Sequence, residues 1–544
     1  MARPASIGRA GIVVASGTLV SRVLGFVNAL LLYNTIGAVG QSADAFALAN
    51  QLPNNIYLIL AGGTITAIIV PAIVRSTGHE DGGERFLNKL VTLGLTIFLV
   101  VAVAVTVAAP LVVRLYAQSG STGFTEDQLG LAFGFAYWLM PEVFFYGVFA
   151  ILSEVLNARG VFWPYAWAPV VNNLVLAGVL VAFRTAFGIV DEQKASEWGT
   201  GQVVLLAGGA TLGIVVQAVV LVLAWRRAGI RFRPDFHWKG AGFGHFGRLA
   251  AWTFAGTVVA QIGGIVESNV VSTATGDASI ASLTLARLIF TLPWSLVTLS
   301  VAVPFFTRMS QHAKAEDRVA LGTDLTRATE AVLLFIVFAA AGLAVLSPSM
   351  ATLFTDDPDG RTAVAGVLAL YLLGLVGTSV QSILMRGWYA MGDTRTPTIF
   401  YFVQVAVYVV LLLTWVLHGP DVAQIANRAA ISMAIAFTVN AVCCLVGMRR
   451  ALPAFRVARV VGRLVWYALA MVPAAAAGLA ITGGLADAGL NRFPGGSWGG
   501  ALLTAVAGAL GMGIVYVAML LVSRNPEIHA FIRPALARLR RRTE

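Results

Sequence analysis

The chain has 544 residues, of which 58% are hydrophobic and only 12% carry a charge. Soluble domains have about a quarter of their residues charged, so this composition excludes a water-soluble protein and requires the bilayer as solvent. The formal net charge of +11 could suggest a nucleic-acid partner, but the basic residues lie in short loops between apolar segments, which excludes that class as well.

Long apolar segments follow one another along the whole chain. A helix needs about 20 apolar residues to cross a bilayer, and only helices or closed barrels satisfy every backbone group in hydrocarbon. The segments are too long and too continuous for barrel strands. We therefore predict an all-α polytopic integral membrane protein with about 14 transmembrane helices. The expected spans are 12–38, 44–73, 88–113, 129–156, 162–186, 201–225, 249–271, 279–305, 328–347, 362–385, 397–417, 424–447, 464–484 and 498–522.

The basic residues test this topology. Of the 37 lysines and arginines, 29 fall in the termini and alternate loops on one side of the predicted membrane or at the span ends next to them, and 6 fall in the loops or span ends on the other. Cytoplasmic loops of membrane proteins carry an excess of Lys and Arg. We therefore expect an even number of spans with both termini in the cytoplasm.

Two short motifs indicate an internal repeat. VPAIVR at 70–75 returns as VPFFTR at 303–308, and ARG at 158–160 returns as AMG at 390–392, at offsets of 233 and 232. We interpret this as two pseudo-symmetric six-helix lobes, residues 1–227 and 228–450, followed by residues 451–544 with two further helices and a basic tail. Parallel repeats are typical of transporters, although chance similarity in an Ala-, Val- and Gly-rich chain is the alternative.

Charged residues inside the apolar spans are the first functional candidates. Arg22 lies about 15 Å into the first span at 1.5 Å per residue, and Arg287 lies in the eighth. A mid-membrane arginine costs at least ~2.5–3.5 kcal/mol and should face a wet cavity or a partner. Glu142, Glu154 and Glu267 are embedded acids, which we treat equally as structural ion-pair partners or as proton or cation ligands.

Polar residues and prolines add weaker signals. Asp44 opens the second span, where capping that helix is the structural alternative. The pairs Asn54–Asn55 and Asn172–Asn173 lie inside spans, where joining helices to one another is the structural alternative. Pro53 and Pro141 interrupt their spans, as helices that line a cavity often do.

Signatures of enzymes and metal sites are missing from the sequence. The six histidines lie in or beside loops, without metal-ligand spacing, and there is no phosphate-binding loop for ATP. Cys443 and Cys444 are adjacent in an apolar span and are expected only to pack. We predict no catalysis, no metal and no cofactor, with energy from the membrane potential or a monovalent cation gradient.

Several motifs together resemble a known family. SRVLGF at 21–26, DAF at 44–46, LPN at 52–54, LNARG at 156–160 and APVVNN at 168–173 are similar to those of the MurJ/MviN lipid II flippases, within the multidrug/oligosaccharidyl-lipid/polysaccharide exporter superfamily. The resemblance implies fourteen helices in two lobes. It also implies export of undecaprenyl-pyrophosphate-linked muropeptide from the inner to the outer leaflet of the bacterial cytoplasmic membrane by alternating access.

The resemblance also implies site residues and partners. Matching motifs make Arg22, Asp44, Asn54 and Arg287 candidates for substrate binding, together with Asn28, which stands where relatives often have arginine. The expected partners are the lipid-linked muropeptide, membrane lipids, and cell-wall synthesis and division proteins. Two alternatives stay open: a sister exporter of other oligosaccharide-lipids or drugs, and a non-transporting scaffold of the wall-synthesis machinery.

Overall fold

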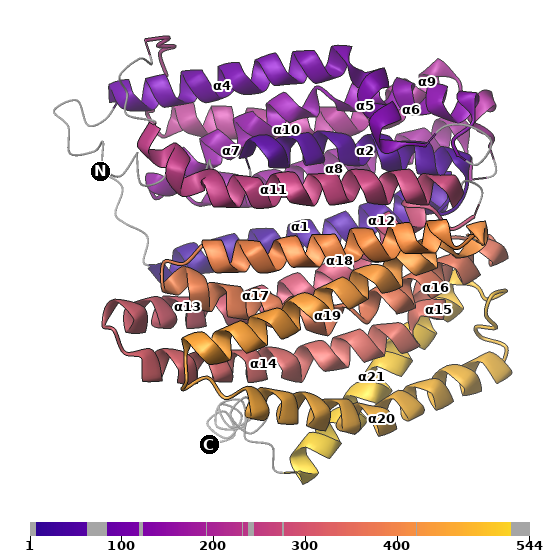
Figure 1. Cartoon of the computed structure of the whole chain (residues 1–544). Coiled ribbons are helices and arrows are strands. Elements are labelled where there is room, and N and C mark those ends of the chain that lie inside the picture. The colour runs from indigo at the N-terminus through magenta and orange to yellow at the C-terminus, as the bar shows by residue number, and fades with distance from the viewer. Residues whose placement is uncertain are drawn as a thin grey trace, which may run out of the picture. The chain divides into compact units, whose positions relative to one another are not determined.

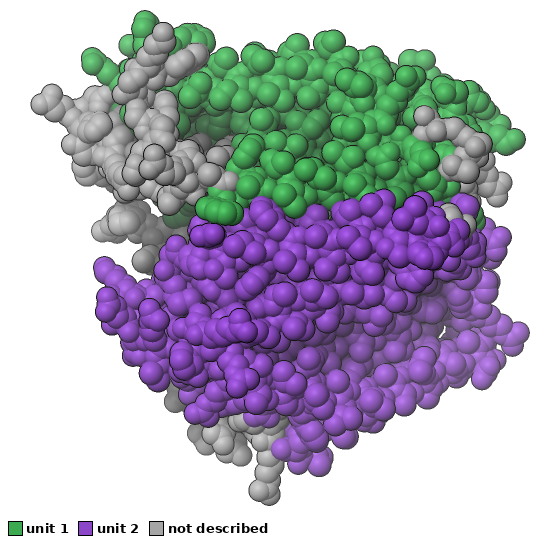
Figure 2. Space-filling view, in the orientation of Figure 1, with its two compact units in different colours: residues 1–281 green, residues 282–544 purple. Residues whose placement is uncertain are grey.

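The computed structural model describes residues 7–61, 84–118, 123–191, 193–230, 232–237, 244–274, 277–419 and 421–523, and the regular secondary structure in these ranges is helical (Figure 1). The chain divides into two compact units, residues 1–281 and 282–544, coloured separately in Figure 2.

Unit 1 is a bundle of long helices. Within it α1 packs on α8, α8 on α10, α10 on α7 and α7 on α4, while α2 lies against α6 and α7. Its helices are α1 (Ile7–Ile36), α2 (Gln41–Ala61), α4 (Glu84–Val107), α5 (Ala109–Tyr116), α6 (Glu126–Leu139), α7 (Glu142–Ala158), α8 (Trp163–Phe187), α9 (Thr200–Val203), α10 (Gly209–Arg227) and α11 (Gly244–Val271).

Unit 2 has a similar construction with two additional helices. α14 contacts α13, α17 and α20, while α19 packs on α16, α17 and α18, and α21 pairs with α20. Its helices are α12 (Ile280–Pro293, which begins in unit 1), α13 (Leu299–Lys314), α14 (Arg318–Val345), α15 (Ser347–Phe354), α16 (Pro358–Leu372), α17 (Leu375–Ala390), α18 (Arg395–Leu417), α19 (Ile425–Ala451), α20 (Val457–Asp487) and α21 (Trp498–Val522).

The lengths and surfaces of the helices are those of a membrane protein. Thirteen helical stretches among the described residues are long and apolar enough to cross a bilayer, and they match thirteen of the predicted spans. The other predicted span, 44–73, begins as α2, and its second half lies outside the described residues. Large aliphatic side chains face outward, with Val107 75% and Leu417 83% exposed, as lipid-facing positions require.

The predicted repeat is visible in the places where helices break. The span of α6 and α7 breaks at Met140 and Pro141, and the span of α16 and α17 breaks 233 residues later at Leu373 and Gly374. Similarly, α5 and α15 are short helices, each with a proline in the first turn, that follow α4 and α14. Proline lacks the N–H that a continuous helix needs and is tolerated at a helix start, which explains the breaks before α5, α7 and α15. The break at Leu373 and Gly374 contains a glycine and no proline.

The three-part division predicted from the sequence, at 227 and 450, stays a prediction. The compact units divide instead near residue 281, because α11 packs on α2 and α5, and because α20 packs on α14. The boundary near residue 281 reflects how compactly the helices pack, whereas the boundaries at 227 and 450 reflect the sequence repeat. The first therefore does not test the other two.

Candidate functional site

The first helix carries a polar track through apolar surroundings. Asn28 is 4% exposed, and its amide donates to the backbone and side-chain oxygens of Asn173 on α8, at 2.9 and 3.2 Å. The Asn173 amide donates in turn to the backbone and hydroxyl oxygens of Ser21, both at 3.0 Å. Arg22 follows Ser21 directly and is half-buried. The structure therefore joins Asn28 to the helix turn that carries Arg22, through a residue of α8.

Asp44 is fully buried at the start of α2. Its Oδ1 accepts the backbone N–H of Ala281 at 2.9 Å, in the first turn of α12. A carboxylate at a helix N-terminus satisfies a donor that has no partner inside the helix. Asp44 thus caps α12, a helix more than 230 residues further along the chain, whereas the structural alternative offered by the sequence was a cap on its own helix.

Glu142 begins α7, directly after the break at Pro141, and is 2% exposed. Its two carboxylate oxygens accept hydrogen bonds from the hydroxyls of Tyr146, at 3.0 Å, and Thr211 on α10, at 3.1 Å. The Tyr146 ring lies 5.6 Å from the ring of Tyr57 on α2. These partners are neutral hydroxyl groups, and no cation is among them.

The other predicted residues lie apart from this group or reach it indirectly. Glu154 lies two turns beyond Tyr146 on α7 and interacts electrostatically with Tyr57, so Tyr57 and Tyr146 connect it to Glu142. Glu267 is half-buried on α11, and Asn54 is exposed on α2. Arg287 is half-buried on α12 and interacts with Tyr401 of α18, within unit 2.

Two buried acids of α14 were missed by the sequence reasoning. Asp324 binds Arg308, at 2.7 Å, and His312, at 3.2 Å, both on α13. Glu330 is 1% exposed and accepts a hydrogen bond from Arg459 of α20 at 3.0 Å. Asp324 precedes the apolar run 328–347, and Glu330 lies at its start. In the sequence both therefore resemble loop or boundary residues. Two acids six residues apart at the start of a long apolar run were the available signal.

A buried arginine outside the predicted set was also missed. Arg361, at the start of α16, is 4% exposed. Its guanidinium donates to the carbonyls of Thr355, at 2.8 Å, of Gly496, at 2.8 Å, and of Pro494. It therefore ties the start of α16 to the loop between α20 and α21.

A metal centre has no counterpart among the described residues: no group of three or more His, Cys, Asp or Glu side chains is arranged to hold an ion. The buried polar groups instead line the interiors of two helical bundles that carry a repeated pattern of breaks. Such a protein belongs to the class of polytopic helical transporters.

Comparison with known proteins identifies the family. A family described as lipid II flippase MurJ matches residues 33–487. The chain is 28% identical over 416 residues to a probable lipid II flippase MurJ of Rhizobium meliloti (strain 1021), covering 74% of each chain. It is 26% identical over 458 residues to lipid II flippase MurJ of Burkholderia cenocepacia, covering 81% of this chain and 84% of the relative. The chain belongs to the lipid II flippase MurJ family.

Solved structures agree with the fold. The inward closed conformation of lipid II flippase MurJ superposes with a TM-score of 0.70 at 20% identity, over 94% of this chain and 99% of that one. An inward-facing multidrug resistance MATE transporter of the MOP superfamily gives 0.64 at 17% identity, over 82% and 98%. The resemblance found in the sequence motifs is confirmed, and so is the all-α membrane fold.

Proposed function

We propose that this chain moves lipid II from the inner to the outer leaflet of the bacterial cytoplasmic membrane by alternating access. The match of the family over residues 33–487 carries this proposal. The construction from two bundles with a repeated pattern of breaks supports it, since repeats of this kind rock about a shared substrate site in transporters. The proposed activity involves no covalent chemistry by the protein itself.

Recognition of the diphosphate is the part that we assign to Arg22. A diphosphate in a low-dielectric cavity needs cationic donors, and a guanidinium offers a planar fork that matches its oxygens. The Ser21–Asn173–Asn28 hydrogen bonds fix α1 against α8 on either side of Arg22, which favours a defined position for its backbone. Arg287, Asp44 and Asn54 stay candidates for contacts with the rest of the substrate.

Energy coupling is the part that we assign to Glu142, with Glu154 and Glu267 as further candidates. Glu142 is buried among neutral hydrogen-bond donors next to a helix break. Gain or loss of one proton there changes the charge of unit 1 at a point where the helix can bend. One charge that crosses 100 mV contributes ~2.3 kcal/mol, enough to bias an equilibrium between two states.

A depletion experiment tests the function. When the only copy of the chain is repressed, lipid II should accumulate in the inner leaflet, and the wild-type chain should reverse the accumulation. Arg22→Ala should fail to reverse it at normal membrane abundance, and Arg22→Lys should do so partly, because an ammonium lacks the bidentate fork. Arg492→Ala, in the exposed loop before α21, is the matched control and should behave as wild type.

Reconstitution of the purified protein in liposomes separates the proposal from its rivals. Purified chain in liposomes should move lipid II across the bilayer, which a scaffold of wall-synthesis proteins would not do. If the liposomes export drugs but leave lipid II in place, the chain is a drug exporter of the fold that MATE transporters share. Growth of cells on Arg22→Ala alone would place the diphosphate contact elsewhere.

A further inference from the structure

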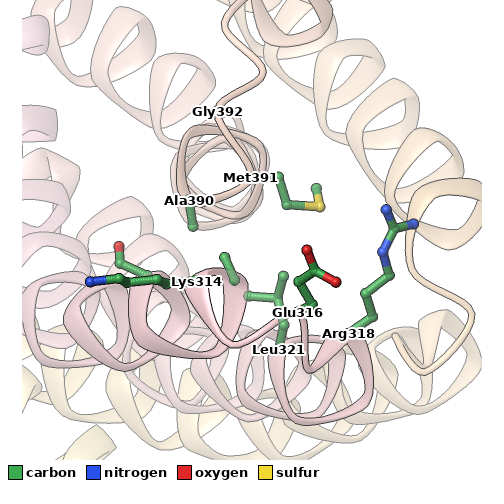
Figure 3. A pocket seen from close by; sticks show the side chains of 9 residues that line it. Lys314, Glu316, Arg318, Leu321, Ala390, Met391 and Gly392 are labelled. Atoms are coloured by element: carbon green, nitrogen blue, oxygen red, sulfur yellow. The ribbon is translucent and has the colours of Figure 1, made fainter.

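A cavity of about 600 Å³ lies at one end of unit 2 (Figure 3). It is formed where α13 turns into α14 and where α17 turns into α18. Three charged residues line it, Lys314, Glu316 and Arg318, and Leu321 and Met391 add apolar surface. None of these residues belongs to the candidate site in unit 1 or to the ion pair between Glu330 of α14 and Arg459 of α20.

The turn that carries Glu316 has an unusual conformation for its residue type. Glu316 has φ of +58°, and every other positive φ among the described residues belongs to a glycine. Side chains disfavour this left-handed region. The turn closes with a hydrogen bond from the Glu316 N–H to the Ala313 carbonyl at 3.1 Å. Glycine would suit the backbone better here, so the carboxylate is present despite a conformational cost.

The charges of the cavity are not used by the fold. Asp324 already engages the two other basic residues near the end of α13, Arg308 at 2.7 Å and His312 at 3.2 Å. By contrast, no hydrogen bond or ion pair among the described residues engages the side chains of Lys314, Glu316 or Arg318. Figure 3 shows Glu316 and Arg318 on the same side of the cavity next to Met391, with Lys314 toward the opposite side.

We propose that this cavity binds the head group of a zwitterionic phospholipid, phosphatidylethanolamine. Arg318 would hold the phosphate diester, and Glu316, on the same side of the cavity, would accept hydrogen bonds from the ammonium. The ends of transmembrane helices lie at the depth of the head groups, where basic pockets bind lipid phosphates. A purely anionic lipid would face the Glu316 carboxylate, so the carboxylate is the feature that selects the ammonium.

Native mass spectrometry of the full-length protein in detergent tests the proposal. The protein is mixed with equal amounts of phosphatidylethanolamine, phosphatidylglycerol and phosphatidylcholine that carry the same acyl chains. Wild type should retain phosphatidylethanolamine in excess, and Glu316→Gln should reduce this preference about fivefold, the effect of one exposed ion pair. Arg318→Gln should lower retention of all three lipids. Arg327→Gln, an exposed arginine of α14 outside the cavity, should match wild type.

A second variant separates lipid binding from folding. Glu316→Gly relieves the left-handed backbone, so it should unfold at a higher temperature than wild type and still lose the preference. An unchanged preference in both Glu316 variants would overturn the proposal. Binding of soluble O-phosphoethanolamine as tightly as of the lipid would also overturn it, since the cavity would then serve a soluble phosphoester.

Discussion

The Asn28 side chain was expected to contact substrate because it replaces an arginine that is common in relatives. Its amide instead donates twice to Asn173, and the side chain is almost fully buried. Polar side chains that bridge helices in a membrane contribute about 0.6–1.7 kcal/mol each. The geometry therefore supports a role in helix packing, and the substrate contact stays a prediction.

Replacing Asn28 distinguishes the two roles. Asn28→Ala should lower the free energy of unfolding by about 1 kcal/mol, because the hydrogen bonds that the Asn28 amide donates to Asn173 are lost. Unfolding in a denaturing detergent titration measures this, with the exposed Asn54→Ala as control. Should Asn28→Ala keep full stability and lose lipid II transport, the side chain acts on the substrate.

Glu142 gives a residue-scale test of coupling. Glu142→Gln keeps the size of the side chain and an oxygen for Tyr146 or Thr211 but removes the protonatable group. We expect transport in liposomes to lose its acceleration by a proton gradient, while stability changes by about 1 kcal/mol or less. Glu126→Gln, exposed at the start of α6, is the control. A gradient response that survives in Glu142→Gln would place the coupling site elsewhere.

Sequence patterns predict elements far better than they predict the partners of individual side chains. Apolar runs of this length leave few alternatives to membrane helices, so thirteen spans were recovered. The break between α4 and α5 was not, because the residues on both sides of Ala108 are equally apolar. For Asp44 the sequence offered capping of its own helix as the alternative to substrate binding, but the capped helix is α12, and no local pattern reports a partner 237 residues away.

Close approach of α1 and α8 makes a prediction at the scale of an element. A Cβ at Gly17 would lie 2.5 Å from the Ala166 carbonyl oxygen, which belongs to the backbone of α8 and cannot move alone. Gly17→Ala should therefore separate the helices and destabilise the chain by about 1–3 kcal/mol. Gly178→Ala is the matched control, since Gly178 is a glycine of the partner helix α8 with open space around its Cβ position. Equal stability of the two variants would show that α1 adjusts without cost.

Orientation in the membrane is a property of the whole molecule. The charge asymmetry predicts that the loop at 226–248 faces the cytoplasm and that the loop at 356–359 faces outward. Single cysteines at His237 and Asp359, both exposed, allow labelling with an impermeant reagent after Cys443 and Cys444 are replaced by alanine. Intact cells should label Asp359→Cys alone. Labelling of His237→Cys in intact cells would show that the predicted topology is inverted.

The last two helices are fastened to unit 2 at three levels. Arg361 holds the loop before α21, Tyr516 of α21 donates to the Leu334 carbonyl at 3.0 Å, and Arg459 of α20 meets Glu330. A chain shortened before α20 would present the Glu330 carboxylate to hydrocarbon without its cation, at a cost of roughly 2.5–3.5 kcal/mol. Grafting these helices between family members should therefore succeed only when α14 is transplanted with them, which makes three helices, and not two, the smallest exchangeable part.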